Sequence, residues 1–473
     1  MTLVFILVSI AVAAVLGLLT RNRWRVPLLL GISALAVYAL QPALPVRGLD
    51  FWLPTATLAL TVLSWVLTTP RPARSWRTNW SAVALLGGIV LALGLTRSLG
   101  VSLPFTASLP PQTLQIIIAL AGISLIAFLL ARFTIPGKAV LTAAFVFLIL
   151  LFVVLKVPAL AEGASRILRG LNGQSTALAS PLDLRWLGFS YIAFRLLHTL
   201  RDRQTGRLPA VSLAEYVIYV IFFPALAAGP IDRLERFLSD LHRPLALSAA
   251  EVGEAGKRLV IGLFKKFVVA DTLAFFTLNG TNALQVRGAG WAWLLLYAYA
   301  FQIYFDFSGY TDIAIGTARL LGFKLPENFN APYLKPNLTQ FWNNWHMTLT
   351  QWFRAYFFNP VTRALRSGKR PLPIPVIIFL TQLGTMVLIG LWHGVTWNFV
   401  AWGLWHGLGL FAHNRWSDLT KTRFAALPAR NQQVLNVGGV LLTFHFVALG
   451  WVFFALPSLS TSMHFLQTLS GLG

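Results

Sequence analysis

The sequence contains no cysteine. Disulfide bonds, thiolate metal sites and cysteine nucleophiles are therefore excluded. Charged residues are scarce, at 11% of the chain, and acidic residues are the rarer kind, with 15 Asp and Glu against 38 Lys and Arg. The sequence also lacks a Gly-x-Ser-x-Gly elbow and any His-x-x-x-His or Glu-x-x-His spacing. Without these patterns we predict neither a serine nucleophile nor a bound metal ion.

Apolar sequence is what the chain has in abundance. Hydrophobic residues make up 56% of its 473 residues, and its mean hydropathy is +0.69. Repeated apolar runs of about 17 to 25 residues are long enough to cross a bilayer as helices. They predict an all-α, polytopic transmembrane bundle of roughly ten to twelve spans, with re-entrant or interfacial helices, in the cell membrane. The runs begin at or near Leu3, Val26, Trp52, Ala82, Gln112, Lys138, Leu213, Trp291, Ile374, Thr396 and Val434.

The formal net charge of +23 comes from short basic segments between these runs. We predict that they are short loops, at residues 21–25, 71–77, 201–207 and 363–370, where topology signals facing the cytoplasm are expected. Such segments attract anionic lipid headgroups and could draw in a phosphate-bearing donor. Stacking platforms and groove-reading elements are not recognisable, so no nucleic-acid partner is predicted.

Composition divides the chain into four parts. Residues 1–157 are apolar spans with no polar constellation, and we predict that they are accessory transmembrane helices. Residues 158–184, rich in Gly, Ser, Arg and Asn, read as a connecting segment, followed by a functional core at 185–413 and a C-terminal segment with one span at 414–473. Within the core, Arg258 and Lys265 lie nearly opposite Val260 and Phe264 on a helix, which predicts an interfacial helix with its basic side toward headgroups.

Two carboxylates stand in an aromatic context at Asp306 and Asp312. On one uninterrupted helix they would point to different sides, and Gly309 could break that helix. The more ordinary interpretation is structural, with Asp312 capping or orienting a helix and Asp306 satisfied by a neighbouring hydroxyl or arginine. The alternative is a direct acid or base role.

His346 is the first of two histidines in segments that otherwise read as membrane helices, where ionisable residues suggest function. Helical geometry places it on one face with Asn343 and Thr350, opposite an aromatic face. Such a helix would turn His346 toward a polar interior. The alternative is a structural histidine bonded to a backbone carbonyl.

His393 ends the apolar run at 374–391, between Gly390 and Gly394, which allow another backbone or a thin acyl chain to come close. A buried, neutral imidazole is suited to act as general base for an alcohol. His406 would be rotated about 220° from His393 on a continuous helix. Both could line one cavity only if the chain bends near residues 394–396, so His406 is interpreted as a packing or supporting residue.

Several of these segments together resemble the membrane-bound O-acyltransferase family, in the family's order over about residues 185–410. The similarity is greatest to the branch that holds the alginate O-acetylation membrane protein and the D-alanyl transfer protein of teichoic acid synthesis. The motifs are Tyr-Phe-Asp-Phe-Ser-Gly-Tyr-Thr-Asp at 304–312, Pro-Glu-Asn-Phe-Asn at 326–330, Phe-Trp-Asn-Asn-Trp-His-Met-Thr-Leu at 341–349, Leu-Trp-His-Gly at 391–394 and the segment at 223–231.

The resemblance implies a helical membrane enzyme in which His393 is the catalytic histidine and His346 the second active-site histidine, both facing a tunnel. An acyl donor, acetyl-CoA or an acyl carrier thioester, would enter from the cytoplasm, with no bound cofactor. The expected acceptor is a hydroxyl of an extracytoplasmic polysaccharide, a lipid-linked acceptor or a carrier protein. A secreted esterase-like acyltransferase or an acyl carrier protein would be the partner.

From these residues we predict transfer of a short acyl group, most simply acetyl. His393 would activate the acceptor hydroxyl, and His346 would orient the reactants or stabilise the oxyanion. Asn343 and Asn344 would support it as hydrogen-bond donors, Trp392 would belong to the site, and the two aspartates would organise the cavity.

Two alternatives stay open. One is D-alanyl transfer from a carrier thioester for cell-envelope polymers. The other is a proton-coupled transporter or flippase whose intramembrane histidines relay protons, although the absence of a visible internal repeat counts modestly against a transporter.

Overall fold

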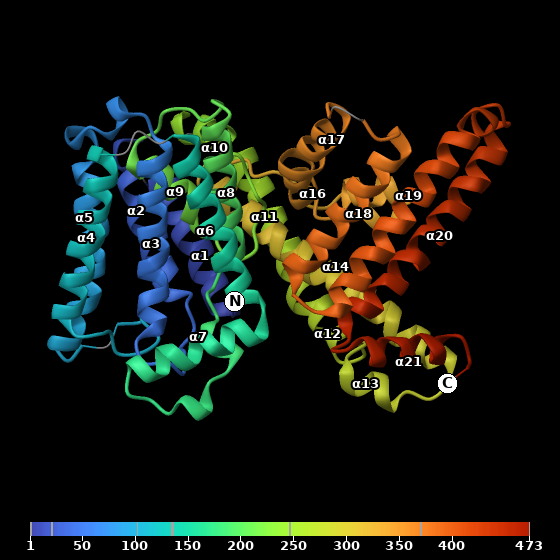
Figure 1. The fold of residues 1–473 in the computed structure, drawn as a ribbon, viewed down its shortest axis with the longest axis horizontal. Helices are drawn as coiled ribbons and strands as arrows, with labels where there is room; N and C mark the ends of the chain where they lie inside the picture. The colour runs from blue at the N-terminus through green and yellow to red at the C-terminus, as the bar shows by residue number, and fades with distance from the viewer. Residues whose placement is uncertain are drawn as a thin grey trace. The chain divides into compact units, whose positions relative to one another are not determined.

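The computed structural model describes residues 2–19, 22–101, 103–133, 137–245, 247–368 and 371–472. Every regular element in these ranges is helical (Figure 1). Arg21, Lys369 and Arg370, from two of the basic segments, lie outside the described residues. The α-helices are α1 (Leu3–Leu19), α2 (Asn22–Ala39), α3 (Leu49–Thr68), α4 (Trp76–Ser98), α5 (Thr113–Phe133), α6 (Lys138–Lys156), α7 (Pro158–Leu171), α8 (Phe189–Gln204), α9 (Leu213–Ile221), α10 (Leu234–His242), α11 (Ala249–Leu263), α12 (Asp271–Ala274), α13 (Gly280–Gln285), α14 (Ala289–Leu320), α15 (Leu338–Asn344), α16 (Met347–Phe353), α17 (Asn359–Arg366), α18 (Ile374–His393), α19 (Trp397–Ala425), α20 (Ala429–Ala455) and α21 (Leu459–Leu469).

Six helices in the described ranges are long and apolar enough to cross a membrane: α3, α4, α5, α6, α18 and α20. Only 6% of the α5 window and 11% of the α6 window is buried inside the protein, against 67% for α3. The apolar side chains of α5 and α6 therefore face outward, as lipid contact requires. The all-helical, multi-pass architecture predicted from the sequence is confirmed.

The six spans are fewer than the ten to twelve expected from apolar runs. The run near residue 213 forms a helix of only 9 residues, and α1 has 17. Helices α14 and α19 are long, at 32 and 29 residues, but they interleave charged and amide side chains with their apolar ones. A hydropathy pattern records apolar density, and it does not separate a span from a helix buried in protein.

The chain forms two compact units, which we describe separately. The first contains Met1–Lys257 and Ala314–Leu325, and the second contains Arg258–Ile313 and Pro326–Gly473. The limits of these units differ from the boundaries that composition predicted at residues 157, 184 and 413. The functional division of the chain stays a prediction. Part of the expected connecting segment is structured within the first unit, because Asp183 accepts hydrogen bonds from Ser165 (2.6 Å) and Arg169 (2.7 Å).

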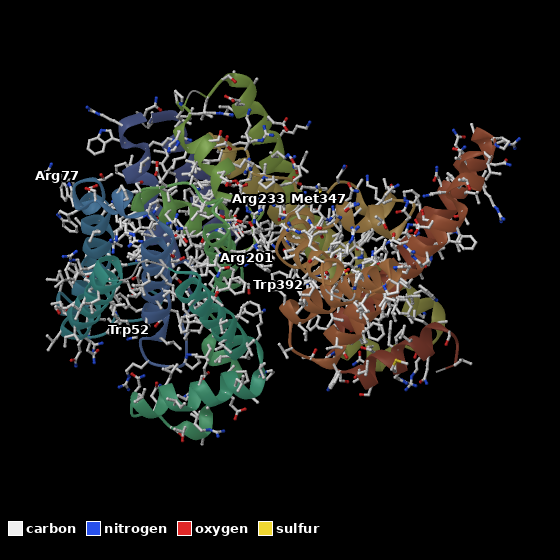
Figure 2. The ribbon with its side chains drawn as sticks, turned by 45° about the horizontal axis from the view of Figure 1, so that its top comes forward. Trp52, Arg77, Arg201, Arg233, Met347 and Trp392 are labelled. Carbon is white, nitrogen blue, oxygen red and sulfur yellow. The ribbon has the colours of Figure 1, made fainter. Side chains whose placement is uncertain are left out.

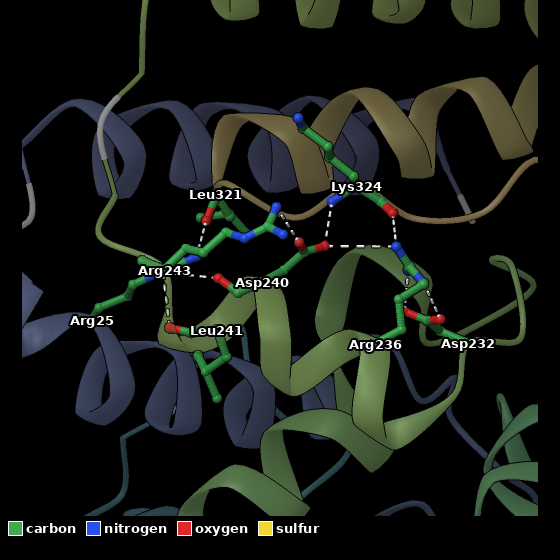
Figure 3. A network of polar contacts seen from close by, with 8 residues as sticks. All are labelled: Arg25, Asp232, Arg236, Asp240, Leu241, Arg243, Leu321 and Lys324. Carbon is green, nitrogen blue, oxygen red and sulfur yellow. Dashed lines mark hydrogen bonds and ion pairs between the residues drawn. The ribbon is translucent and has the colours of Figure 1, made fainter.

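In the first unit, the prediction that residues 21–25 form a loop is wrong, because α2 begins at Asn22. Arg25 lies inside α2 and is only 5% exposed. Its Nη1 donates to the carbonyls of Asp240, Leu241 and Arg243, and its Nη2 donates to the carbonyl of Leu321 (Figure 3). These carbonyls lie at the ends of α10 and α14, where backbone oxygens lack helical partners. A guanidinium is matched to several such acceptors at once, so Arg25 ties three helices together.

Arg236 makes a second connection in the same network. Its side chain donates to the carboxylate of Asp232 and to the carbonyl of Lys324 (Figure 3). The amide of Lys324 in turn donates to Asp240 at 2.9 Å. The chain that follows α14 is thereby held against α10.

Candidate active site

The connection between α15 and α16, both in the second unit, is broken at His346. Helix α15 ends at Asn344, Trp345 is extended, and His346 has φ 42° and ψ 53°, a left-handed conformation. Among the described residues, Ala331 is the other non-glycine residue with positive φ. The predicted continuous face that joined Asn343, His346 and Thr350 is therefore wrong. Periodicity could not reveal the break, because no glycine or proline marks it.

Asn328 holds this turn in place. Its backbone carbonyl accepts a hydrogen bond from Met347 N at 2.9 Å. Its Oδ1 accepts from Thr348 N at 3.3 Å and from Thr348 Oγ1 at 2.6 Å, and the residue is fully buried. Left-handed non-glycine residues persist only where their surroundings over-determine them, and they cluster at functional sites. The sequence presented Asn328 only as one member of a motif, so its role as a clamp was missed.

The His346 ring is 3% exposed and lies among aromatic rings. Its centroid is 4.7 Å from that of Phe307, edge to face, and 6.0 Å from that of Trp392. Its Nε2 has no hydrogen-bond partner among the described residues. Burial lowers the pKa of His346, which lies outside the six candidate spans. The ring is therefore neutral, with one buried nitrogen free for a reacting group.

Trp392 brings the second histidine to the same place. Its ring centroid is 4.5 Å from that of His393, so one indole contacts both imidazoles. Phe454 packs against His393 from α20 at 4.7 Å. Met347 and Trp392, the neighbours of the two histidines in the chain, are labelled in Figure 2. Two histidines from separate sequence motifs thus share one aromatic environment, which the sequence alone could not establish.

Close packing of α18 against α19 positions His393 at the end of its helix. A Cβ on Gly403 would lie 2.6 Å from Val387 Cα, and one on Gly390 would collide with the carbonyl of Phe399. The sequence allowed either a neighbouring backbone or an acyl chain to lie against Gly390, and in the structure it is the backbone of Phe399. The chain leaves helical geometry after His393 and resumes it at Trp397, the bend that the sequence left open.

His406 lies away from solvent, at 0% exposure. Edge-to-face contacts place its ring 5.0 Å from Trp342 and 4.9 Å from Trp402. This environment fits its interpretation as a packing residue.

The two predicted amide donors are engaged elsewhere. Asn343 accepts a hydrogen bond from Arg354 at 2.8 Å and, with Thr350, lines a separate cavity of about 140 Å³. Asn344 donates to the carbonyl of Gln340 in its own helix at 2.8 Å.

The two aspartates are on one continuous helix, α14, and both are paired. Asp306 binds Lys266, while Asp312 binds Arg258 and Lys265, the latter at 2.7 Å. The prediction that Arg258 and Lys265 face headgroups is therefore wrong. Their helix ends in a π-helical segment, Phe264–Ala270, and its basic side turns to the carboxylates of α14.

Close backbone contact explains this arrangement. A Cβ on Gly262 would lie 2.7 Å from the carbonyl oxygen of Gly309. Because neither residue has a side chain, the two helices approach closely enough for the ion pairs to form. Gly309 therefore serves packing, and α14 continues through it unbroken.

A cavity of about 380 Å³ lies within the second unit. Its lining includes Met347, which follows His346, and Ser308, which follows Phe307. Charged groups at its wall are Arg258, Lys265, Asp312 and Glu327. Asp312 is among the lining residues and Asp306 is not, and the role of the two aspartates in organising the active site stays a prediction. No group of three or more His, Asp or Glu side chains suited to a metal ion occurs in the described part of the chain.

The fold and the site together define a polytopic helical membrane protein with two histidines, His346 and His393, in one aromatic environment. A model of the family described as MBOAT, membrane-bound O-acyltransferase, matches residues 119–455, well over half of the chain. The protein therefore belongs to the membrane-bound O-acyltransferase family and is an O-acyltransferase. The family resemblance seen in the motifs is confirmed, and the match begins within the apolar segment where no motif was recognised.

Three known relatives illustrate the range of activities in this family. The chain is 30% identical over 58% of its length to the teichoic acid D-alanyltransferase of Streptococcus thermophilus, covering 68% of that protein. It is 34% identical over 54% of its length to the peptidoglycan O-acetyltransferase of Helicobacter pylori, covering 47% of that protein. It is 36% identical over 57% of its length to the probable alginate O-acetylase AlgI of Pseudomonas syringae, covering 48% of that protein. The chain spans about half the length of the last two.

Proposed function

We propose that the protein moves an acetyl group from a cytoplasmic thioester donor to a hydroxyl of an extracytoplasmic polysaccharide or its carrier protein. The observation that carries this proposal is the contact of Trp392 with both histidines, one of them held in a left-handed turn. Two relatives named as O-acetylases or O-acetyltransferases support the acetyl group.

In this proposal His393 is the general base. The acceptor hydroxyl gives its proton to His393 while its oxygen adds to the carbonyl carbon of the thioester. The C–S bond then breaks, and the leaving thiolate takes the proton back from His393. Neutral His346, through its buried Nε2, donates a hydrogen bond to the oxyanion that forms on the carbonyl oxygen. Trp392 and Phe454 exclude water, which would otherwise hydrolyse the thioester.

Acetyl-CoA and an acyl carrier thioester both fit this chemistry, and a secreted esterase-like acyltransferase is the partner we propose for the acetyl route. D-alanyl transfer is the second candidate, because a D-alanyltransferase is among the relatives. A proton-coupled transporter is set aside, since the family is one of acyltransferases.

The test is His393→Ala in a cell that depends on this protein for envelope acylation. Mild alkali releases ester-linked acyl groups from the isolated envelope polymers, and chromatography separates acetate from D-alanine. We expect the variant to lose at least about a hundredfold of the released acyl group, in line with removal of a general base.

His464→Ala is the matched control, because His464 is exposed on α21 and lies outside the family match. Wild-type acylation by the His393 variant, at equal protein level, would disprove the base assignment. Release of D-alanine in place of acetate would select the second candidate.

A further inference from the structure

The 380 Å³ cavity lined by Met347 contains two buried hydroxyl groups that the proposed reaction does not use. Ser308 and Thr311 are each 2% exposed, and both line the cavity. Neither hydroxyl oxygen has a hydrogen-bond partner among the described residues. Buried polar groups are rarely left unsatisfied, because each loses its interaction with water. Two such groups on one cavity wall therefore indicate a polar ligand.

The charges at the wall indicate which ligand. Asp312 is already bound by both Arg258 and Lys265, and its side chain is 7% exposed. Glu327 binds Arg258, and its side chain is 42% exposed. Arg258 and Lys265 can donate more hydrogen bonds than these two contacts use, and hydroxyls can donate as well. The wall therefore has a surplus of donors, and Glu327 is the carboxylate that an incoming anion can replace.

We propose that this cavity binds a phosphate ester, held by Lys265, Arg258 and the hydroxyls of Ser308 and Thr311, and that Glu327 competes with it for Arg258. The inference rests on the proposed function. Acetyl-CoA and acyl carrier thioesters both present their acyl group on a phosphopantetheine arm, so both carry a phosphate ester. Met347, which follows His346 in the chain, lines the cavity, and the length of the pantetheine arm separates a phosphate bound there from the thioester that reacts.

An anionic lipid headgroup carries the same phosphate chemistry. The donor is favoured because the hydroxyls are almost completely buried, whereas a headgroup stays at the membrane surface. The experiment distinguishes the two sources.

Binding is measured on the full chain in nanodiscs of phosphatidylcholine, with His393→Ala as background so that no acyl transfer is needed. The probes are 4′-phosphopantetheine and pantetheine, which differ only in the phosphate. We expect tighter binding of 4′-phosphopantetheine by about tenfold or more, the size of a charge-assisted hydrogen-bond contribution. Equal binding of the two probes would overturn the proposal.

Three variants locate the phosphate. Thr311→Val removes a hydroxyl at nearly constant volume, so it should reduce the preference for 4′-phosphopantetheine while leaving the melting temperature unchanged or raised. Lys265→Gln should largely abolish the preference, whereas Lys266→Gln, whose lysine pairs with Asp306 outside the cavity lining, should retain it. Glu327→Gln should strengthen phosphate binding by several-fold. An unchanged preference in Thr311→Val, or weaker binding in Glu327→Gln, contradicts the site.

Replacing phosphatidylcholine by phosphatidylglycerol tests the lipid source. If the donor is the ligand, affinity for 4′-phosphopantetheine is retained in both lipids. If that affinity is lost in phosphatidylglycerol, and if the protein binds phosphatidylglycerol in a way that Lys265→Gln reduces, the cavity belongs to a lipid headgroup and the donor assignment is overturned. If His393→Ala acylates like wild type while the preference for 4′-phosphopantetheine is intact, the proposed reaction is rejected and the phosphate site is supported.

Discussion

Substituting Asn328 by alanine tests whether the strained turn at His346 is needed for acyl transfer. Alanine removes Oδ1, which accepts hydrogen bonds from Thr348 N and Thr348 Oγ1. At about 0.5–1.5 kcal/mol each, these two bonds contribute about 1–3 kcal/mol. The left-handed conformation of His346 costs about 1–3 kcal/mol. Because the two magnitudes are similar, loss of the clamp should let the turn relax and move the imidazole.

We therefore expect Asn328→Ala to lower acyl transfer by about fivefold to about a hundredfold, the equivalent of 1–3 kcal/mol in the barrier. The assay is alkali-released acyl group per folded protein, with folding followed by size-exclusion chromatography and thermal unfolding in detergent. Asn172→Ala is the control, because this exposed side-chain amide, at the C-cap of α7, donates to the carbonyl of Leu168 within that helix. Wild-type activity in folded Asn328→Ala would refute the argument that this turn positions His346.

Two further predictions concern stability. Burial raises the pKa of Asp183, but the hydrogen bonds led by that from Arg169 outweigh it, so the net pKa is lowered. The ionised Asp183 therefore stabilises the fold at pH values above its pKa in the unfolded chain, about 3.9. This stabilisation is lost as the pH falls through the lower pKa of Asp183 in the folded protein. The melting temperatures of wild type and Asp183→Asn should therefore converge in acid, and a difference that stays constant with pH would contradict this prediction. Gly403→Ala should destabilise by about 1–3 kcal/mol through overpacking against Val387, while Gly438→Ala, with open space at its Cβ, should not; equal melting temperatures of the two variants would show that α18 and α19 can separate without cost.

Much of the site could be named in advance because its residue types are costly in a membrane protein. His346 and His393 stood out as ionisable groups among apolar residues, and Asp306 and Asp312 stood out in the same way. Asn328 did not, because an amide in a turn-rich segment has an ordinary local explanation. Its importance comes from contacts with Met347 and Thr348, which are distant in sequence.

Basic residues were the least predictable part of the chain. Local pattern assigned Arg25 to a loop and Arg258 to a membrane surface, because charge near apolar runs normally marks topology. In the structure Arg25 binds backbone carbonyls at two helix ends, and Arg258 binds Asp312 and Glu327. A charged side chain is stable inside a protein only with such partners, and partners from other helices leave no local pattern.

The sequence by itself determined the membrane class, the helical fold and the family, because apolar length, composition and motif order are local properties. Tertiary structure alone decided the break at His346, the contact of Trp392 with both histidines and the pairing of the charges on α14. Each of these depends on groups far apart in the chain that meet only after the helices pack. Packing also left the buried hydroxyls of Ser308 and Thr311 on one cavity wall, and they make a phosphate site the next feature to test.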